Sequence, residues 1–164
     1  MTKTLILLRH AKSSWANPDL PDHSRPLNKR GQRGAKAIGK WLRGAGLVPD
    51  RALVSDARRT RETWEGLGLD APLTLTPALY DATPRQILDV VIADGHGDVV
   101  LVIGHNPGIG VLAAEMAASA PEHPRFAQFP TAACLVLELP CADWAEAAPG
   151  SGVVRAFVTP HDLT

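Results

Sequence analysis

The chain has 164 residues, 45% of them hydrophobic, which suits one globular domain spanning residues 1–164 with a sizeable core. Its 17 Lys and Arg residues balance 17 Asp and Glu residues, so no net charge favours binding to nucleic acid or to a membrane surface. No signal-peptide pattern and no apolar run near the ~20 residues that cross a bilayer are found, so we expect a cytoplasmic protein.

The first predicted element is a short apolar strand, residues 5–8, that ends abruptly in Arg9 and His10. An unbroken apolar run of this length is typical of a strand buried on both faces in a parallel sheet. In open α/β sheets, ligands bind at the carboxyl ends of such strands. Arg9 and His10 are therefore candidates for a cleft, although a buried strand that happens to end in polar residues explains this segment equally well.

A proline-rich segment, residues 13–27, follows the strand and is predicted to be an ordered loop. Loops that follow strand ends often contribute side chains to a site. Lys12, Ser13 and Arg25 are thus candidate anion ligands, while each could equally be a solvated surface residue.

Two predicted helices follow this loop, separated by a short strand. The first, residues 29–45, is capped by Asn28 and carries its apolar residues at helical spacing. The second follows a short strand, residues 51–55, with Ser55 or Asp56 as its cap. Its first turn holds three arginines, Arg58, Arg59 and Arg61. One of them can point into a cleft, while the other two are accounted for by an exposed helix face with salt bridges to Glu62.

The second half of the chain repeats the opening pattern. A fully buried strand, residues 98–103, ends in Gly104-His105-Asn106-Pro107, so a second histidine follows a strand end. The remaining predicted elements are an edge strand (73–77), a loop (78–82), helices at 85–93 and 108–118, and strands at 132–139 and 153–158. Thr83, followed by Pro84, is the predicted cap of the helix at 85–93. The other four histidines lack such placement and are predicted at the surface: His23, His96, His123 and His161.

The alternation of strands and helices predicts an α/β fold, a three-layer sandwich with a mostly parallel sheet and helices on both faces. Such a sheet would gather Arg9, His10, His105 and one arginine from residues 58–61 at one edge. Guanidinium groups bind phosphoryl oxygens in pairs, and a neutral imidazole is a nucleophile toward phosphorus. Clustered positive charge should lower the pKa of His10. Cys134 and Cys141 lack metal-site spacing, so we expect no metal and no other cofactor.

Three separated segments resemble the histidine phosphatase (phosphoglycerate mutase-like) superfamily. Residues 8–11, Leu-Arg-His-Ala, resemble its Arg-His-Gly motif, and residues 55–63 resemble its Ser-Pro-x-x-Arg-x-x-Gln/Glu-Thr segment. Gly104-His105-Asn106-Pro107 resembles its second histidine motif, and residues 25–31 with the short length are most similar to the SixA-type phosphohistidine phosphatases. The resemblance implies a phosphoglycerate mutase-like fold.

By this resemblance, His10 is the residue that is transiently phosphorylated. Arg9, Arg59 and His105 would bind the phosphoryl group and stabilise its transition state, with Asn106, Lys12 and Arg25 as further substrate-binding candidates. The resemblance thus selects Arg59 over its two neighbours. Ala11 stands where the family has glycine, so its backbone must avoid positive φ or be strained, and Asp56 stands where the family has proline.

Many phosphatases of this family place a glutamate after the third strand to protonate the leaving alcohol. That region offers only Asp81 here, which could serve as the acid or simply form a turn, and the turn is slightly favoured. A phosphohistidine leaving group needs less protonation, so a phosphorylated protein is the favoured partner, with phosphate or another oxyanion in the pocket. The alternatives are a phosphatase acting on small phosphorylated metabolites, with Asp81 as acid, and a non-catalytic phosphate- or phosphoprotein-binding module.

Overall fold

In the computed structural model, which describes residues 1–164, a six-stranded sheet runs in the order β3-β2-β4-β1-β5-β6. The strands are β1 (Lys3–Arg9), β2 (Arg51–Ser55), β3 (Leu73–Thr76), β4 (Val99–Gly104), β5 (Cys134–Leu139) and β6 (Val153–Val158). The first four strands are mutually parallel, whereas β5 pairs antiparallel with both β1 and β6. The predicted mostly parallel sheet is confirmed, with an antiparallel pair at one edge.

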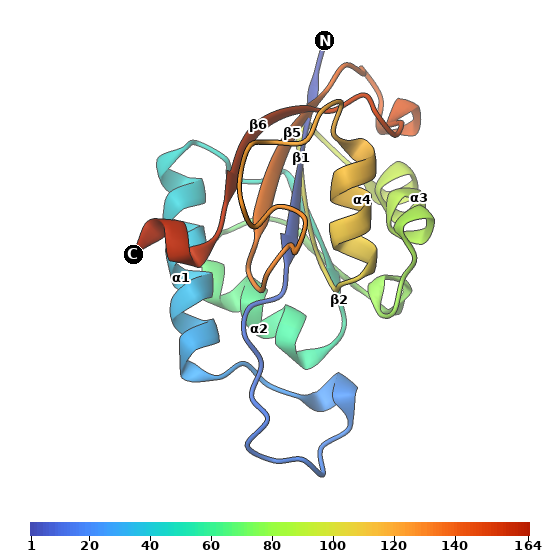
Figure 1. Cartoon of the computed structure of the whole chain (residues 1–164). Coiled ribbons are helices and arrows are strands. Elements are labelled where there is room, and N and C mark those ends of the chain that lie inside the picture. Colours follow the sequence, from blue (N-terminus) through green and yellow to red (C-terminus); the bar gives the residue numbers. More distant parts are fainter.

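Two helices cover each face of this sheet (Figure 1). They are α1 (Lys29–Gly44) and α2 (Arg58–Leu67) on one side, and α3 (Pro84–Asp94) and α4 (Gly108–Met116) on the other. Successive residues of β1 point to opposite faces, so Leu5 and Leu7 join the core under α3 and α4, while Ile6 and Leu8 join the core under α1 and α2. All four side chains are fully buried, and the predicted three-layer sandwich is confirmed.

The helix starts follow the predicted capping chemistry in two cases and depart from it in one. Asn28 accepts the Gly31 N–H at 2.8 Å, and Thr83 forms a capping box with Gln86 ahead of Pro84. The predicted cap of α2 is wrong, because its N-cap is Ala57 and no side chain caps it. The side chains of Ser55 and Asp56 are bound instead to His105 and His23.

Several predicted boundaries also change. β5 begins at Cys134 instead of residue 132, because Ala132 has a left-handed φ of 58° and donates its N–H to the carbonyls of Arg9 and His10. The predicted loop 13–27 contains a 3₁₀ turn at Asp22–Ser24. A second turn, Pro77–Leu79, takes in the last residue of the predicted strand 73–77 and the start of the predicted loop 78–82, because β3 ends at Thr76. Two further turns lie at Trp144–Glu146 and Pro160–Leu163. α4 ends at Met116, and no helix combines the length and apolar character needed to cross a bilayer.

Candidate active site

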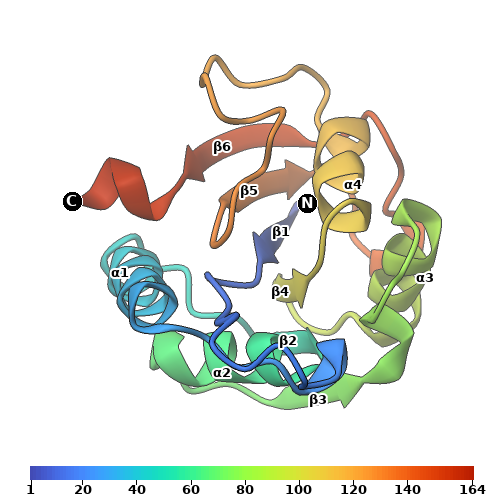
Figure 2. The same ribbon diagram turned by 60° about the horizontal axis from the view of Figure 1, so that its bottom comes forward.

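The strand register places the two motif histidines side by side. Arg9 is the register partner of Gly104 across the parallel β1–β4 pair, and the His10 N–H donates to the Gly104 carbonyl at 3.1 Å. His10 and His105 therefore leave the sheet at the same level, and their ring centroids lie 5.3 Å apart. Both side chains are buried. The carboxyl ends of β1 and β4 lie side by side, as predicted (Figure 2).

The two nitrogens of His10 have different surroundings. Nδ1 lies 2.7 Å from the carbonyl oxygen of Ala11, and a carbonyl can only accept, so Nδ1 carries the proton. The lone pair of the neutral ring is then on Nε2. Burial lowers the pKa of His10 to about 4, with Arg59 and Arg9 adding to the shift and the Ala11 carbonyl opposing it. Burial contributes more than the clustered charge that the sequence predicted.

His105 is held by a strand residue. Its Nε2 lies 2.8 Å from Ser55 Oγ, and its buried Nδ1 has no hydrogen-bond partner within the protein. Burial, followed by the proximity of His10 and Arg59, lowers the pKa of His105 to about 3. Both imidazoles are therefore neutral at neutral pH, and the hydrogen-bonding capacity of His105 Nδ1 is unused within the protein.

Arg9 and Asn106 share an anchor in the loop before β5. Arg9 Nη1 and Asn106 Nδ2 donate to the carbonyl of Phe129, at 3.2 and 3.0 Å, and Arg9 Nε remains unpartnered. Asn106 Oδ1 also accepts the Gly110 N–H at 3.1 Å. The Asn106 amide is therefore engaged within the protein and fixes the loop that orients Arg9.

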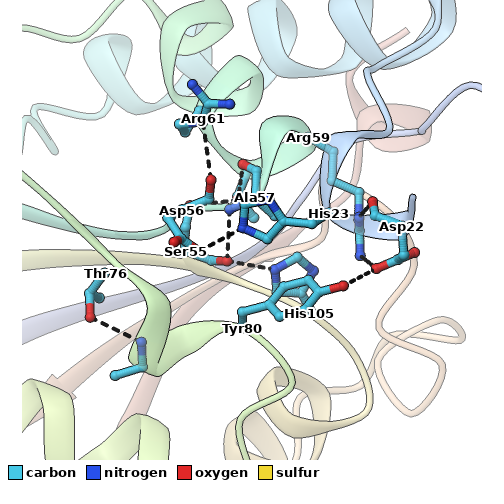
Figure 3. A network of polar contacts seen from close by, with 12 residues as sticks. Asp22, His23, Ser55, Asp56, Ala57, Arg59, Arg61, Thr76, Tyr80 and His105 are labelled. Carbon is cyan, nitrogen blue, oxygen red and sulfur yellow. Dashed lines mark hydrogen bonds and ion pairs between the residues drawn. The ribbon is translucent and has the colours of Figure 1, made fainter. Parts of the chain in front are cut away.

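Arg59 enters the site from the first turn of α2 and is buried. Its guanidinium donates to the main-chain carbonyl of Asp22 at 2.7 Å and to the Asp22 carboxylate at 3.0 Å. The Tyr80 hydroxyl donates to the same carboxylate, and the Tyr80 ring packs edge-on against His105 at a centroid distance of 5.4 Å (Figure 3). The hydrogen bond from Tyr80, followed by Arg59, lowers the pKa of Asp22, which is therefore ionised at neutral pH.

Asp22 and Tyr80 are site residues that the sequence analysis missed. Each lies in a segment predicted to be a loop, and nothing in the local sequence separates Asp22 from the neighbouring Asp19. Only the folded position of the 3₁₀ turn Asp22–Ser24, which lies in front of α2, brings its carboxylate to Arg59 (Figure 2).

The two arginines beside Arg59 bind other groups. The predicted salt bridge forms at Arg58 only, because Arg61 binds a backbone carbonyl. Arg58 pairs with Glu62 at 3.0 Å, and Arg61 Nε donates to the Asp56 carbonyl at 3.1 Å. Ala11 has no positive φ, and its N–H donates to Thr63 Oγ1 at 3.0 Å, so the missing glycine causes no backbone strain.

The remaining candidates lie further from the histidine pair. Arg25 is buried against the Trp15 ring, 3.6 Å from its centroid, and donates to the Ser14 carbonyl. Lys12 lies on a separate hollow beyond His10. Asp81 is exposed at a left-handed φ of 52°, as in a turn, yet it lines a hollow together with His105 and Asn106.

Two histidines predicted at the surface are half-buried. His23 Nε2 lies 2.9 Å from Asp56 Oδ1, and His123 Nε2 lies 2.9 Å from Asp162 Oδ2. His96 and His161 are exposed, as predicted. No group of three His, Cys, Asp or Glu side chains in the chain could hold a metal ion.

Comparison with known proteins agrees with this geometry. The family model of the histidine phosphatase superfamily (branch 1) matches residues 5–83. An uncharacterized protein of Mycobacterium tuberculosis is 35% identical over 161 residues, covering 94% of this chain and 100% of that protein. The phosphohistidine phosphatase SixA of Escherichia coli (strain K12) is 30% identical over 120 residues, covering 68% of this chain and 73% of SixA.

A solved SixA-type structure from Nakamurella multipartitia superposes with a TM-score of 0.84 and 31% identity, covering 98% of this chain and 97% of that one. The sequence relatives, the fold and the residues at the strand ends thus all point to one family. The chain belongs to the histidine phosphatase superfamily and is of the SixA type.

Proposed function

We propose that the protein is a phosphatase that works through a covalent phosphohistidine on His10 and that its substrate is protein phosphohistidine. The observation that carries the proposal is the pairing of His10 with the Ala11 carbonyl, which leaves the Nε2 lone pair of a neutral imidazole free beside two guanidinium groups. This arrangement suits nucleophilic attack on an anionic phosphoryl group.

The reaction has two steps. In the first, His10 Nε2 forms a bond to phosphorus as the bond from phosphorus to the substrate imidazole breaks, and that imidazole keeps the electron pair and takes a proton from water. In the second, water attacks phospho-His10, the P–N bond breaks toward His10, which returns to its neutral form, and inorganic phosphate leaves. The proton lost from the attacking water neutralises the hydroxide that the first step leaves. We assign the Ser55 hydroxyl as the donor to His105 Nε2, so that the unpartnered Nδ1 carries the proton. Arg9, Arg59 and this Nδ1–H would then stabilise the phosphoryl oxygens.

Three arguments favour a phosphohistidine over an alkyl phosphate. An imidazole nitrogen is a far better leaving group than an alkoxide and needs less protonation. The carboxylate bound to Arg59, that of Asp22, is kept ionised by Tyr80, so it holds no proton to donate at neutral pH. The name of the E. coli relative, phosphohistidine phosphatase, points to the same substrate class.

A second candidate is a phosphatase for small phosphomonoesters or anhydrides with Asp81 as the acid. Its support is the hollow that Asp81 shares with His105 and Asn106, where a leaving group could reach the carboxyl. Against it stand the exposure of Asp81 and its turn conformation.

The first experiment separates an enzyme from a phosphate-binding module. We expect wild-type protein to hydrolyse a generic aryl phosphate and to acquire an acid-labile phosphoryl label, and His10→Ala to lose both by at least about 10³-fold. His96→Ala, at an exposed histidine, is the matched control and should retain wild-type turnover. Equal rates in wild type and His10→Ala would remove His10 from the mechanism.

The second experiment separates the two substrate classes. Release of phosphate is measured from a phosphohistidine protein and from a panel of alkyl phosphates, with wild type and Asp81→Asn. We expect the phosphohistidine to be preferred and Asp81→Asn to be neutral for it. Preference for alkyl esters together with a requirement for Asp81 would establish the small-molecule alternative.

A further inference from the structure

A second hollow adjoins the segment that carries the nucleophile. It opens between the start of α1, the loop before β5 and the C-terminal turn Pro160–Leu163, and residues of all three segments line it. Ala11 and Lys12, which follow His10 directly, form part of its wall, and so does Ala132, whose N–H donates to the His10 carbonyl at 3.0 Å. The hollow therefore lies next to the phosphoryl site but is lined by none of its four motif residues.

The charge of this hollow is one-sided. Its lining includes Lys12, Arg30, Arg125 and His161, all exposed, and no carboxylate side chain. None of the seven ion pairs of the chain involves any of these four residues. In a chain with equal numbers of acidic and basic residues, such an unpaired local surplus creates a positive potential that attracts anions.

The carboxylate next to His161 in sequence, that of Asp162, forms no ion pair with Lys12, Arg30 or Arg125. Its Oδ2 lies 2.9 Å from His123 Nε2 and accepts hydrogen bonds from the backbone N–H and the hydroxyl of Thr159. Asp162 is thus committed to the C-terminal turn, and the cations of the hollow remain free for an external partner.

The positive region is elongated. A neighbouring hollow shares Arg30 and His161 with the first and adds Arg33, one helical turn farther along α1, and the last residue, Thr164. Cations spread over two adjoining hollows suit several anionic groups in succession better than one compact anion. No Phe, Tyr or Trp lines either hollow, so the surface lacks the rings on which nucleic-acid bases stack.

We propose that this basic groove, formed around Lys12, Arg30, Arg33 and Arg125, binds acidic side chains of the substrate protein that flank its phosphohistidine. The proposal rests on the proposed function and adds a sequence preference to it. Glu and Asp side chains of an extended segment would reach the groove while the phosphoryl group lies at His10. Exposed cations of this kind raise the association rate and contribute modest affinity, both sensitive to salt.

The test uses two phosphohistidine peptides that differ only in having Glu or Gln around the phosphohistidine. Wild type should show a KM about 10-fold lower for the Glu peptide, with similar kcat for both, and this preference should shrink at high salt. Arg30→Gln combined with Arg125→Gln should abolish the preference. Lys36→Gln combined with Lys40→Gln makes the same change in charge on the exposed face of α1 outside the basic groove and should keep it.

No preference in wild type, or equal loss of preference in both double variants, would overturn the proposal. A binding measurement keeps its failure distinct from failure of the proposed function, since it needs no turnover. An unphosphorylated Glu-rich peptide should shift the backbone amide NMR signals of Lys12, Gly31 and Thr131 in wild type, and not in the Arg30/Arg125 double variant. Unshifted amides, or tighter binding of a single-stranded oligonucleotide at the same amides, would reject an acidic protein segment as the ligand.

Discussion

His10 presents one nitrogen to the protein and the other to the site. Because Nδ1 must donate to the Ala11 carbonyl at 2.7 Å, the tautomer is fixed by a backbone acceptor one residue away. The same burial that disfavours the charged ring also keeps the imidazole of His10 neutral across the physiological range. One hydrogen bond and one desolvated position thus provide what a nucleophilic histidine requires.

This environment predicts the titration of His10. Since its pKa is lowered to about 4, the ring should stay neutral from neutral pH down to about pH 5 and become protonated only below that. The measurement is an NMR pH titration of the imidazole in the free protein, with His10→Asn used to assign the signal. A midpoint close to 6.5, the ordinary value for histidine, would show that the ring is solvated and would contradict the buried arrangement.

Asp22 places a carboxylate where an anionic substrate would compete for the same guanidinium. Both terminal nitrogens of Arg59 contact Asp22, one through the main chain and one through the side chain. A bound phosphoryl group must share Arg59 with this carboxylate or displace it. Asp22 therefore holds Arg59 in position in the free protein, and its negative charge should oppose the binding of an oxyanion at Arg59.

Asp22→Asn should accordingly tighten oxyanion binding. The amide oxygen can still accept from Arg59, but the negative charge is gone, so we expect the inhibition constant of inorganic phosphate or tungstate to fall by about 5-fold. Tyr80→Phe, which keeps the carboxylate and removes only its hydroxyl donor, is the control and should change this constant much less. Unchanged or weaker oxyanion binding in Asp22→Asn would contradict a competition between this carboxylate and the oxyanion for Arg59. A lower kcat only for substrates with poor leaving groups would instead indicate that Asp22 protonates the leaving group.

At the level of elements, α1 and α2 approach each other more closely than ordinary side chains permit. A Cβ atom placed on Gly39 would lie 1.9 Å from the Leu67 carbonyl oxygen, and one on Gly66 would lie 2.8 Å from the Ala35 Cβ. The close crossing matters for the site because α2 carries Arg59 in its first turn. Glycines in α1 and α2 thus help to set the depth at which Arg59 enters the site.

Gly39→Ala should therefore destabilise the protein, whereas Gly44→Ala should not. The added methyl at position 39 meets backbone that cannot move without separating the helices, so we expect a loss of about 2–3 kcal/mol in the free energy of unfolding. Nothing lies within 4 Å of a Cβ on Gly44, at the end of the same helix, so its change should stay within about 1 kcal/mol. Urea denaturation measures both, and similar values for the two variants would contradict the close crossing.

For the whole molecule, folding buries two titratable rings in one place. The pKa values of about 4 for His10 and about 3 for His105 lie below the ordinary value of 6.5. At pH values between about 4 and 6.5, the unfolded chain binds more protons than the folded one. The free energy of unfolding therefore decreases as the pH falls from 6.5 toward 4. The site consequently makes the fold sensitive to acid well above the range in which carboxylates titrate.

The double substitution His10→Asn/His105→Asn should flatten this dependence. Each histidine contributes a slope on the order of 1.4 kcal/mol per pH unit within the window, so wild type should lose stability between pH 6.5 and pH 5 more steeply than the variant. Urea denaturation at these two pH values gives the comparison. Parallel pH dependences in the two proteins would show that the rings are not held neutral by the fold.

The strands, the helix caps and the order of the elements were predictable from local sequence. The apolar runs of β1 and β4 each end in a histidine, and strands buried on both faces in a parallel sheet must end at a common edge. The caps at Asn28 and Thr83 and the alternation of strands with helices depend on neighbouring residues alone, so pattern was sufficient to predict them. The resemblance then selected Arg59 from three adjacent arginines.

Tertiary structure alone decided how the site is completed. Asp22 is 37 residues from Arg59 and 58 from Tyr80, so no local pattern indicates their contact. The same holds for the loop carbonyl of Phe129 that holds Arg9 across 120 residues, and for the placement of Lys12 on a separate basic groove. Sequence patterns report which elements form and what they bury, whereas contacts between loops depend on how the packed sheet and helices bring those loops together.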